Sequence, residues 1–188
     1  MSGGETGASF RVVGERVAWS GRRLAVSEVD VEGPGGSRHG REVVRHPGAV
    51  AVVPLHDDGT ITLLRQYRVA LDAEVWEVPA GVRDVDGEPT EETARRELAE
   101  EAGLSARRLD HMITFHNSAG FSDESVVVYV ATGLTEVPDD RQGVEEQHMQ
   151  VARMPLTEAL AMVDDGRITD AKTVIAVLDL ARRRVGAP

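Results

Sequence analysis

The sequence predicts an α/β protein, namely an α/β/α sandwich with a mixed sheet that is preceded by a small N-terminal antiparallel β-sheet. Three observations indicate this fold class. Short segments with strand-like patterns fill most of the chain, one helical segment interrupts them at residues 90–103, and two further helical segments follow the last strand. Strands and helices in this order generally form a sheet that is covered by helices on both faces.

The N-terminal part of the chain predicts the small sheet. Residues 1–9 are small and polar, and we expect a disordered arm. Polar and apolar residues alternate over 10–19 and 22–31, as in half-buried strands, and 39–46 predict a third strand after a glycine-rich turn. Three short strands are only marginally stable alone. We therefore expect residues 10–46 to form a β subdomain that needs a partner surface, and residues 47–188 to form the main domain.

The rest of the chain predicts the sandwich. Residues 48–55 are almost continuously apolar, which is typical of a strand that is buried on both faces. Further strands are expected at 61–68, 74–78, 109–115, 125–132 and 149–154. Apolar residues at helical spacing then predict one helix that starts near Leu156 and stops at Gly166, and another over 171–184.

The composition excludes several classes of protein. No apolar run approaches the roughly 18 residues of a membrane-spanning helix, and the N-terminus lacks the features of a signal peptide, so we expect a cytoplasmic protein with no membrane partner. The absence of cysteine excludes disulfides, thiolate zinc sites and a cysteine nucleophile. A net charge of −11 disfavours binding to a nucleic-acid backbone.

The candidate site lies in the helical segment 90–103. Glu97, Glu100 and Glu101 are spaced three or four residues apart, so they project from one side of a helix, where like charges repel. A divalent cation that is held by oxygen ligands would relieve this repulsion, and the hard carboxylate oxygens suit Mg²⁺ or Mn²⁺.

The ends and faces of this helix are also predicted. Thr90 is the expected N-cap, and Gly103 closes the helix in the left-handed conformation. On the faces of the helix, we expect an apolar stripe to pack on the body of the protein. We also expect Arg96 to hold Glu100, and Glu88 to hold Arg96. The stripe consists of Ala94, Leu98 and Ala102.

The same stretch resembles the box of the Nudix hydrolases, G-x(5)-E-x(7)-R-E-U-x-E-E-x-G-U, where U is apolar. The matching residues are Gly81, Glu88, Arg96, Glu97, Leu98, Glu100, Glu101, Gly103 and Leu104. One residue more than the pattern allows separates Gly81 from Glu88. The ADP-ribose pyrophosphatase branch often carries such an insertion after a W-E-x-P-A-G segment, which residues 76–81 match.

The resemblance implies metal-dependent hydrolysis of a phosphoanhydride in a homodimer whose N-terminal sheets are exchanged. It implies that Glu97 and Glu101 bind the metal with the backbone carbonyl of Ala80, and that Glu100 is a ligand or lies next to one. We group Glu97 and Arg96 with the catalytic residues. The general base in this branch often comes from a loop before the last strand, where Glu146 is our first choice and Glu145 the second.

The substrate-binding candidates are spread along the chain. Arg41 resembles the arginine that the N-terminal sheet offers to substrate in this branch, and Glu77 belongs to the segment before the box. Arg65 and Arg68 are suited to phosphate, but strand residues three apart point to opposite faces, so at most one lines the pocket and the other forms a surface salt bridge. The loop after the box contributes three more candidates, Phe121, Ser122 and Asp123.

The expected substrate is ADP-ribose, cleaved to AMP and ribose 5-phosphate, or a related nucleoside diphosphate sugar. Ala119 stands where hydrolases of ADP-ribose in this branch usually have proline, so other substrates stay open: another nucleotide sugar, NADH, a dinucleoside polyphosphate or an oxidised nucleotide. A non-catalytic nucleotide sensor is the alternative from another class.

Overall fold

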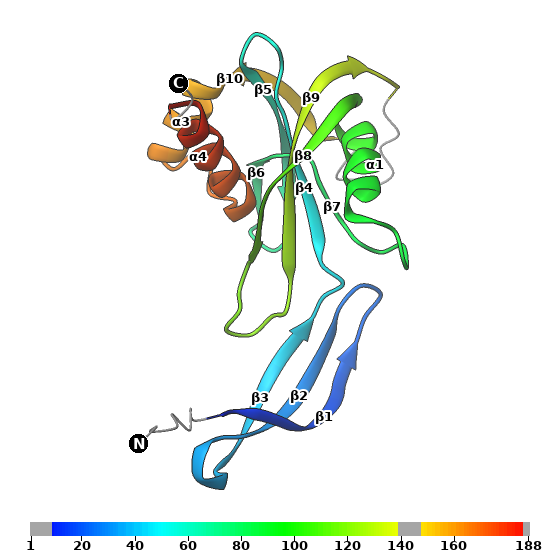
Figure 1. Ribbon diagram of the computed structural model, residues 1–188, viewed down its shortest axis with the longest axis vertical. Coiled ribbons are helices and arrows are strands. Elements are labelled where there is room, and N and C mark those ends of the chain that lie inside the picture. The colour runs from blue at the N-terminus through cyan, green and yellow to red at the C-terminus, as the bar shows by residue number, and fades with distance from the viewer. Residues whose placement is uncertain (1–8, 139–147, 186–188) are drawn as a thin grey trace, which may run out of the picture. The chain divides into compact units, whose positions relative to one another are not determined.

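The computed structural model describes residues 9–138 and 148–185, which divide into two compact units. In the first unit, the strands β1 (Arg11–Ser20), β2 (Ala25–Glu32) and β3 (Arg38–Arg45) form an antiparallel sheet in the order β1-β2-β3 (Figure 1). The short helix η1 (Pro34–Gly36) makes the expected turn between β2 and β3. Strand β2 begins three residues later than predicted, because Gly21 N donates to Leu24 O at 2.8 Å and closes a turn there.

The segment Ser118–Glu124 also belongs to the first unit. The predicted N-terminal subdomain, residues 10–46, did not include this segment. Val44 N donates to Phe121 O at 2.7 Å, and Val44 forms a parallel bridge with Ser122. The carboxylate of Asp123 accepts hydrogen bonds from His46 N at 2.9 Å and from Arg45 at 3.0 Å. The loop is therefore attached to the end of β3 by backbone and side-chain contacts.

The second unit contains two sheets. The mixed sheet has the order β7-β4-β9-β8, in which β4 (Ala49–Pro54) runs parallel to β9 (Ser125–Glu136), while β7 (Ala80–Val82) and β8 (Leu104–His116) are antiparallel to their neighbours. The other sheet has the order β10-β5-β6 and contains β5 (Thr60–Arg68), β6 (Ala73–Glu77) and β10 (Gln150–Pro155). The short β7 was not predicted, and β8 begins directly after the central helix rather than at residue 109.

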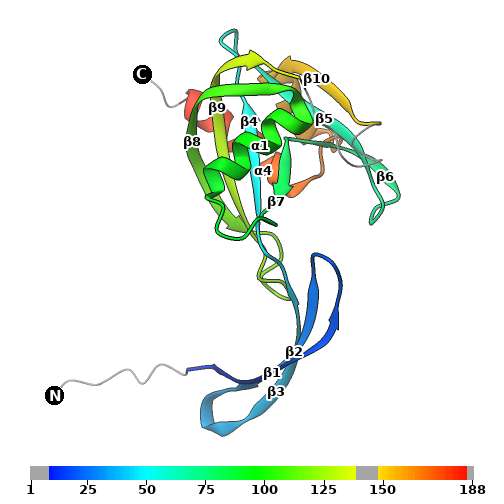
Figure 2. The same ribbon diagram turned by 90° about the vertical axis from the view of Figure 1, so that its right-hand side faces the viewer.

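Helices cover this unit on both sides (Figures 1 and 2). The helix α1 (Thr90–Ala102) packs Ala94 and Leu98 against Val50 and Val52 on one face of the mixed sheet. On the other face, the core includes side chains of β4, the second sheet, α3 (Leu156–Asp164) and α4 (Ala171–Val185). The predicted α/β/α sandwich with a mixed sheet is confirmed, and so is the burial of β4 on both faces. No helix in the described part of the chain is long and apolar enough to cross a membrane.

The two ends of α1 differ in how well they were predicted. The prediction of Thr90 as N-cap was wrong: Pro89 is the N-cap and α1 begins at Thr90, whose hydroxyl shares a hydrogen bond of 2.7 Å with the Tyr129 hydroxyl. Thr90 thus ties α1 to β9 instead of capping the helix. The prediction for the other end is confirmed, because Gly103 has a left-handed φ of 63° and its N donates to Ala99 O at 3.1 Å.

Candidate active site

Two buried carboxylates on α1 lie against the chain segment that leads into β7. The residues Glu97 and Glu101 are only 9% and 5% exposed. Ala80 N donates to Glu101 Oε2 at 2.8 Å. A Cβ atom on Gly81 would lie 2.0 Å from Glu97 Cδ, so only a glycine at this position leaves room for the carboxylate. Residues 80 and 81 therefore form a cradle for both carboxylates.

Arg96 connects the acidic side chains around this cradle. Its guanidinium lies 2.7 Å from Glu97 Oε1, 3.4 Å from Glu100 Oε2 and 3.2 Å from Glu88 Oε2. Glu88 is itself held by the Thr93 hydroxyl at 2.8 Å. The structure thus shows both predicted contacts of Arg96, with Glu100 and with Glu88.

The charge of this cluster is not balanced. Glu88, Glu97 and Glu100 share the single guanidinium of Arg96, and Glu101 lies one turn further along the same helix. Burial is the main cause that raises the pKa of Glu97 to about 7; the negative charge of Glu100 acts in the same direction, and Arg96 opposes it. An ionised carboxylate that is buried without full compensation favours a nearby cation.

These residues fit a divalent metal ion. The residues that could hold it are Glu97, Glu101, the carbonyl of Ala80 and Glu100, and all of them supply the oxygen ligands that hard cations prefer. Within residues 9–138 and 148–185, no three acidic or histidine side chains already form a complete metal site. Mutual repulsion of the carboxylates and the insertion of Arg96 between Glu97 and Glu100 account for this arrangement.

The two arginines of β5 have different partners. Arg65 is paired with Glu74 at 2.7 Å, and its guanidinium lies 5.9 Å from the centre of the Trp76 ring. Arg68 donates to both oxygens of Glu77, at 2.6 and 2.7 Å. Arg65 is thus occupied by an exposed salt bridge, and Arg68 remains the better candidate for phosphate.

A second polar cluster, around Glu77, was missed in the sequence. Glu77 is 2% exposed, and besides Arg68 it contacts Lys172. Lys172 also donates to Asp170 at 2.8 Å. One sequence signal pointed here: Lys172 is the only lysine among 21 basic residues.

The candidates in the first unit make mostly local contacts. Arg41 is exposed, and its Nη1 donates to the carbonyl of Gly40 at 2.7 Å. Phe121 is 58% exposed, and Ser122 Oγ accepts a hydrogen bond from Glu124 N at 3.2 Å. Asp123 is engaged with Arg45 and His46 N, so its carboxylate holds the loop. The proposed bases Glu145 and Glu146 lie outside the described residues.

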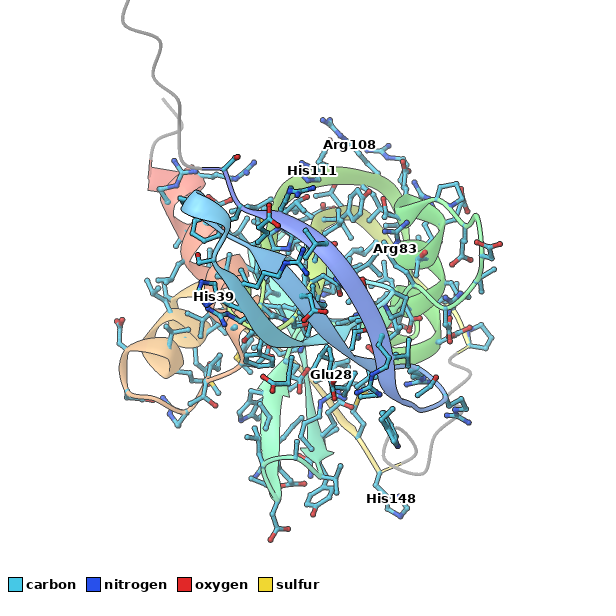
Figure 3. All side chains as sticks on the ribbon, turned by 90° about the horizontal axis from the view of Figure 1, so that it is seen from below. Glu28, His39, Arg83, Arg108, His111 and His148 are labelled. Atoms are coloured by element: carbon cyan, nitrogen blue, oxygen red, sulfur yellow. The ribbon has the colours of Figure 1, made fainter. Side chains whose placement is uncertain are left out.

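Two arginines carry a buried donor without a partner. Among the described residues, Nε of Arg96 and Nε of Arg83 are buried and make no hydrogen bond. Arg83, which Figure 3 labels, directly follows β7, and its N donates to Gly48 O at 3.0 Å. Buried donors of this kind usually meet a water or an anion, so Arg83 is an additional candidate that the sequence did not suggest.

The histidines do not form a competing site. In Figure 3, His111 and His148 of the second unit lie on opposite sides of the view, far from each other. His111 contacts Thr114 at 2.9 Å, and its ring stands edge-on to Tyr129, with 6.1 Å between the ring centres. His111 is exposed and is engaged by these two neighbours.

Comparisons with known proteins identify close relatives. Residues 45–176 match the NUDIX domain family. An ADP-ribose pyrophosphatase of Mycobacterium tuberculosis is 41% identical over 169 residues, which cover 90% of this chain and 82% of that protein. An ADP-ribose pyrophosphatase of Bacillus subtilis is 37% identical over 167 residues, with 89% and 90% covered. A crystal structure of an ADP compounds hydrolase has the same fold, with a TM-score of 0.80 over 98% of both chains at 24% identity.

Proposed function

The chain belongs to the Nudix family and is a Nudix hydrolase, and on this premise we propose that it cleaves the diphosphate bond of ADP-ribose to give AMP and ribose 5-phosphate. The observation that carries the proposal is the pair of buried carboxylates, Glu97 and Glu101, that face the cradle at Ala80 and Gly81. The two relatives above, both ADP-ribose pyrophosphatases, support the choice of substrate. Related nucleoside diphosphate sugars are the alternative substrates.

Hydrolases of this family generally use a divalent metal ion, and we propose Mg²⁺ or Mn²⁺ here. Glu97, Glu101 and the carbonyl of Ala80 would hold it, with Glu100 as a further ligand or next to one. Such an ion would supply positive charge to the diphosphate and would make water a better nucleophile. Arg96 keeps Glu97 and Glu100 in place, so these carboxylates do not need to be ordered during the reaction.

The general base in this proposal is Glu146, with Glu145 as the second choice. Replacing the base with glutamine removes proton abstraction from the attacking water and should lower kcat by about 10² to 10⁴-fold. Metal affinity should stay close to that of the wild type, because the metal ligands are unchanged. Steady-state kinetics of Glu146→Gln and Glu145→Gln, together with metal titrations, would identify the base as the variant with the larger loss. An unchanged kcat in Glu146→Gln would refute our first choice.

We also propose a homodimer in which residues 10–46, the predicted N-terminal subdomain, provide both the contact and part of the substrate site. Exposed apolar side chains on or next to β1 support this, and three short strands need a partner surface. These side chains are Phe10, Val12, Val17 and Trp19. Light scattering should give twice the chain mass of 20.3 kDa, and a monomer at working concentration would contradict the proposal.

The substrate arms in this proposal are Arg41 and Arg68, with Phe121, Ser122 and Asp123 from the loop, and Glu77 contributes by holding Arg68. Arg68 is the strongest of them, because its side chain is 42% exposed and the orientation of its guanidinium is fixed by Glu77. The charge of Arg68 then suits the diphosphate.

The test of the function is a hydrolysis assay with Mg²⁺ across ADP-ribose, ADP-glucose, GDP-mannose, NADH and diadenosine polyphosphates, in which the nucleotide and sugar phosphate products are separated by chromatography. A preference for ADP-ribose would support the proposal. Turnover of another diphosphate alone would overturn the choice of substrate and point to the loop that contains Ala119. The absence of any turnover would favour the alternative of a non-catalytic nucleotide sensor.

A further inference from the structure

Four side chains of alternating charge form a chain of ion pairs that runs from Asp170, just before α4, to Arg68 at the end of β5. Asp170 contacts Lys172, Lys172 contacts Glu77, and Glu77 contacts Arg68. The middle of the chain is well shielded, since the side chains of Glu77 and Lys172 are 2% and 13% exposed, whereas that of Arg68 is 42% exposed. The chain of charges thus has a buried middle and ends in a cation at the surface.

Among residues 9–138 and 148–185, the outer end of this chain offers a donor that could bind an anion. Arg68 uses Nε and Nη2 for Glu77, and within the described residues its Nη1 makes no hydrogen bond. The hydrogen bonds to Glu77 are the main cause that raises the pKa of Arg68, and the negative charge of Glu101 contributes.

The inner end of the chain is fixed by the first turn of α4. The carboxylate of Asp170 accepts hydrogen bonds from Thr173 N at 3.0 Å and from the Thr173 hydroxyl at 2.6 Å, as an N-cap does. The same hydroxyl accepts a hydrogen bond from Val78 N at 2.9 Å. The helix N-terminus and these bonds stabilise the charge of Asp170, so Lys172 is left to balance Glu77.

The charge of Lys172 affects how strongly Arg68 can attract an anion. Burial alone would raise the pKa of Glu77, but the hydrogen bonds of Arg68 and the charges of Lys172 and Arg68 outweigh this effect and lower it. Without Lys172, the two carboxylates of Asp170 and Glu77 would outnumber Arg68, and the net charge of −1 would weaken the attraction for a diphosphate. With Lys172, the four side chains have no net charge, and their exposed end is the cation Arg68.

We propose that Lys172 is a positioning residue for diphosphate recognition. Its positive charge neutralises Glu77, so Glu77 can hold the Arg68 guanidinium while the guanidinium still attracts the negatively charged substrate. The inference rests on the proposed function and adds a residue to it. A lysine suits this position because its compact ammonium group donates to Glu77 and Asp170 at once, whereas an arginine presents a planar fork.

The first test is Lys172→Met. The KM for ADP-ribose should rise about tenfold, which corresponds to the loss of one charge-assisted contribution to binding. The kcat should change far less, because the carboxylates on α1 are untouched. Calorimetric binding of the α,β-methylene analogue of ADP-ribose should weaken by the same factor, a readout that does not require turnover. The control is Arg167→Met, which removes an exposed cation that is paired with Asp165 and should leave both quantities unchanged.

The second test separates charge balance from simple packing. Adding Glu77→Gln to Lys172→Met removes the charges of both Glu77 and Lys172, while Arg68 keeps its positive charge. The double variant should therefore bind the analogue more tightly than Lys172→Met alone. Two packing defects would instead add to each other. If Lys172→Met does not fold, as judged by thermal unfolding, Lys172→Gln is used because its amide can still hydrogen-bond both carboxylates.

The outcomes distinguish this inference from the proposed function. All variants are measured on the diphosphate that the wild type turns over fastest. An unchanged KM in Lys172→Met, or a double variant that binds more weakly than Lys172→Met, would overturn the role of Lys172 while the function stands. A wild type that neither binds the analogue nor hydrolyses any of the diphosphates would overturn both.

Discussion

Replacing Glu97 or Glu101 with glutamine is expected to lower kcat/KM for ADP-ribose by about 10³-fold or more while the protein stays folded. Glutamine has the size of glutamate but is a neutral and much weaker ligand for a hard cation, so the charge stabilisation that a divalent ion supplies would be lost. The fold should survive, because the amide oxygen of a glutamine at 101 can still accept the hydrogen bond from Ala80 N.

The two variants should also separate activity from stability. Glu97 is buried in a cluster whose negative charge is not balanced, so Glu97→Gln should leave the midpoint of thermal unfolding at pH 7 equal to or above that of the wild type. Turnover with Mg²⁺, metal titration and circular dichroism would measure these effects. The control is Glu92→Gln, an exposed carboxylate in the first turn of α1. Full activity in either Glu97→Gln or Glu101→Gln would show that these residues do not bind the metal.

Replacing Gly81 with alanine is expected to lower kcat by about 10²-fold, the effect of moving a catalytic group by roughly 1 Å. The new Cβ would lie 2.0 Å from Glu97 Cδ and 2.1 and 2.4 Å from its two oxygens, so the carboxylate must leave its place. Its movement should cost little stability, because the end of a flexible side chain can shift. The backbone of Gly81 does not need glycine, since it has no positive φ.

The matched control for this variant is Gly40→Ala, because a Cβ on Gly40 would meet nothing within 4 Å. Kinetics, metal titration and thermal unfolding of both variants would show whether the position of Glu97 affects turnover and metal binding. The expected pattern is a loss of activity and metal affinity in Gly81→Ala alone, with both proteins close to the wild type in stability. Normal activity in Gly81→Ala would mean that the position of Glu97 against this residue is not needed for turnover.

One error of the sequence analysis has a clear physical origin. Thr90 has the right type and place for an N-cap, but its hydroxyl pairs with Tyr129, which is 39 residues away. Asp123, which stays a candidate for contact with substrate, likewise has distant partners in Arg45 and His46 N. A polar side chain takes the partner that the fold brings to it, and local sequence does not specify that partner.

Local sequence patterns predicted the class of the fold, the limits of α1 to within one residue, the contact of Arg96 with Glu100 and the side of α1 that carries the carboxylates. Each of these follows from periodicity or from spacing within one or two helical turns, where neighbours in sequence are neighbours in space. Packing between distant elements places Glu97 over Gly81, joins the loop 118–124 to the first sheet, and brings Lys172 to Glu77 across 95 positions of the chain. Contacts at such separations depend on how the elements pack, and the residue types alone allow many other pairings.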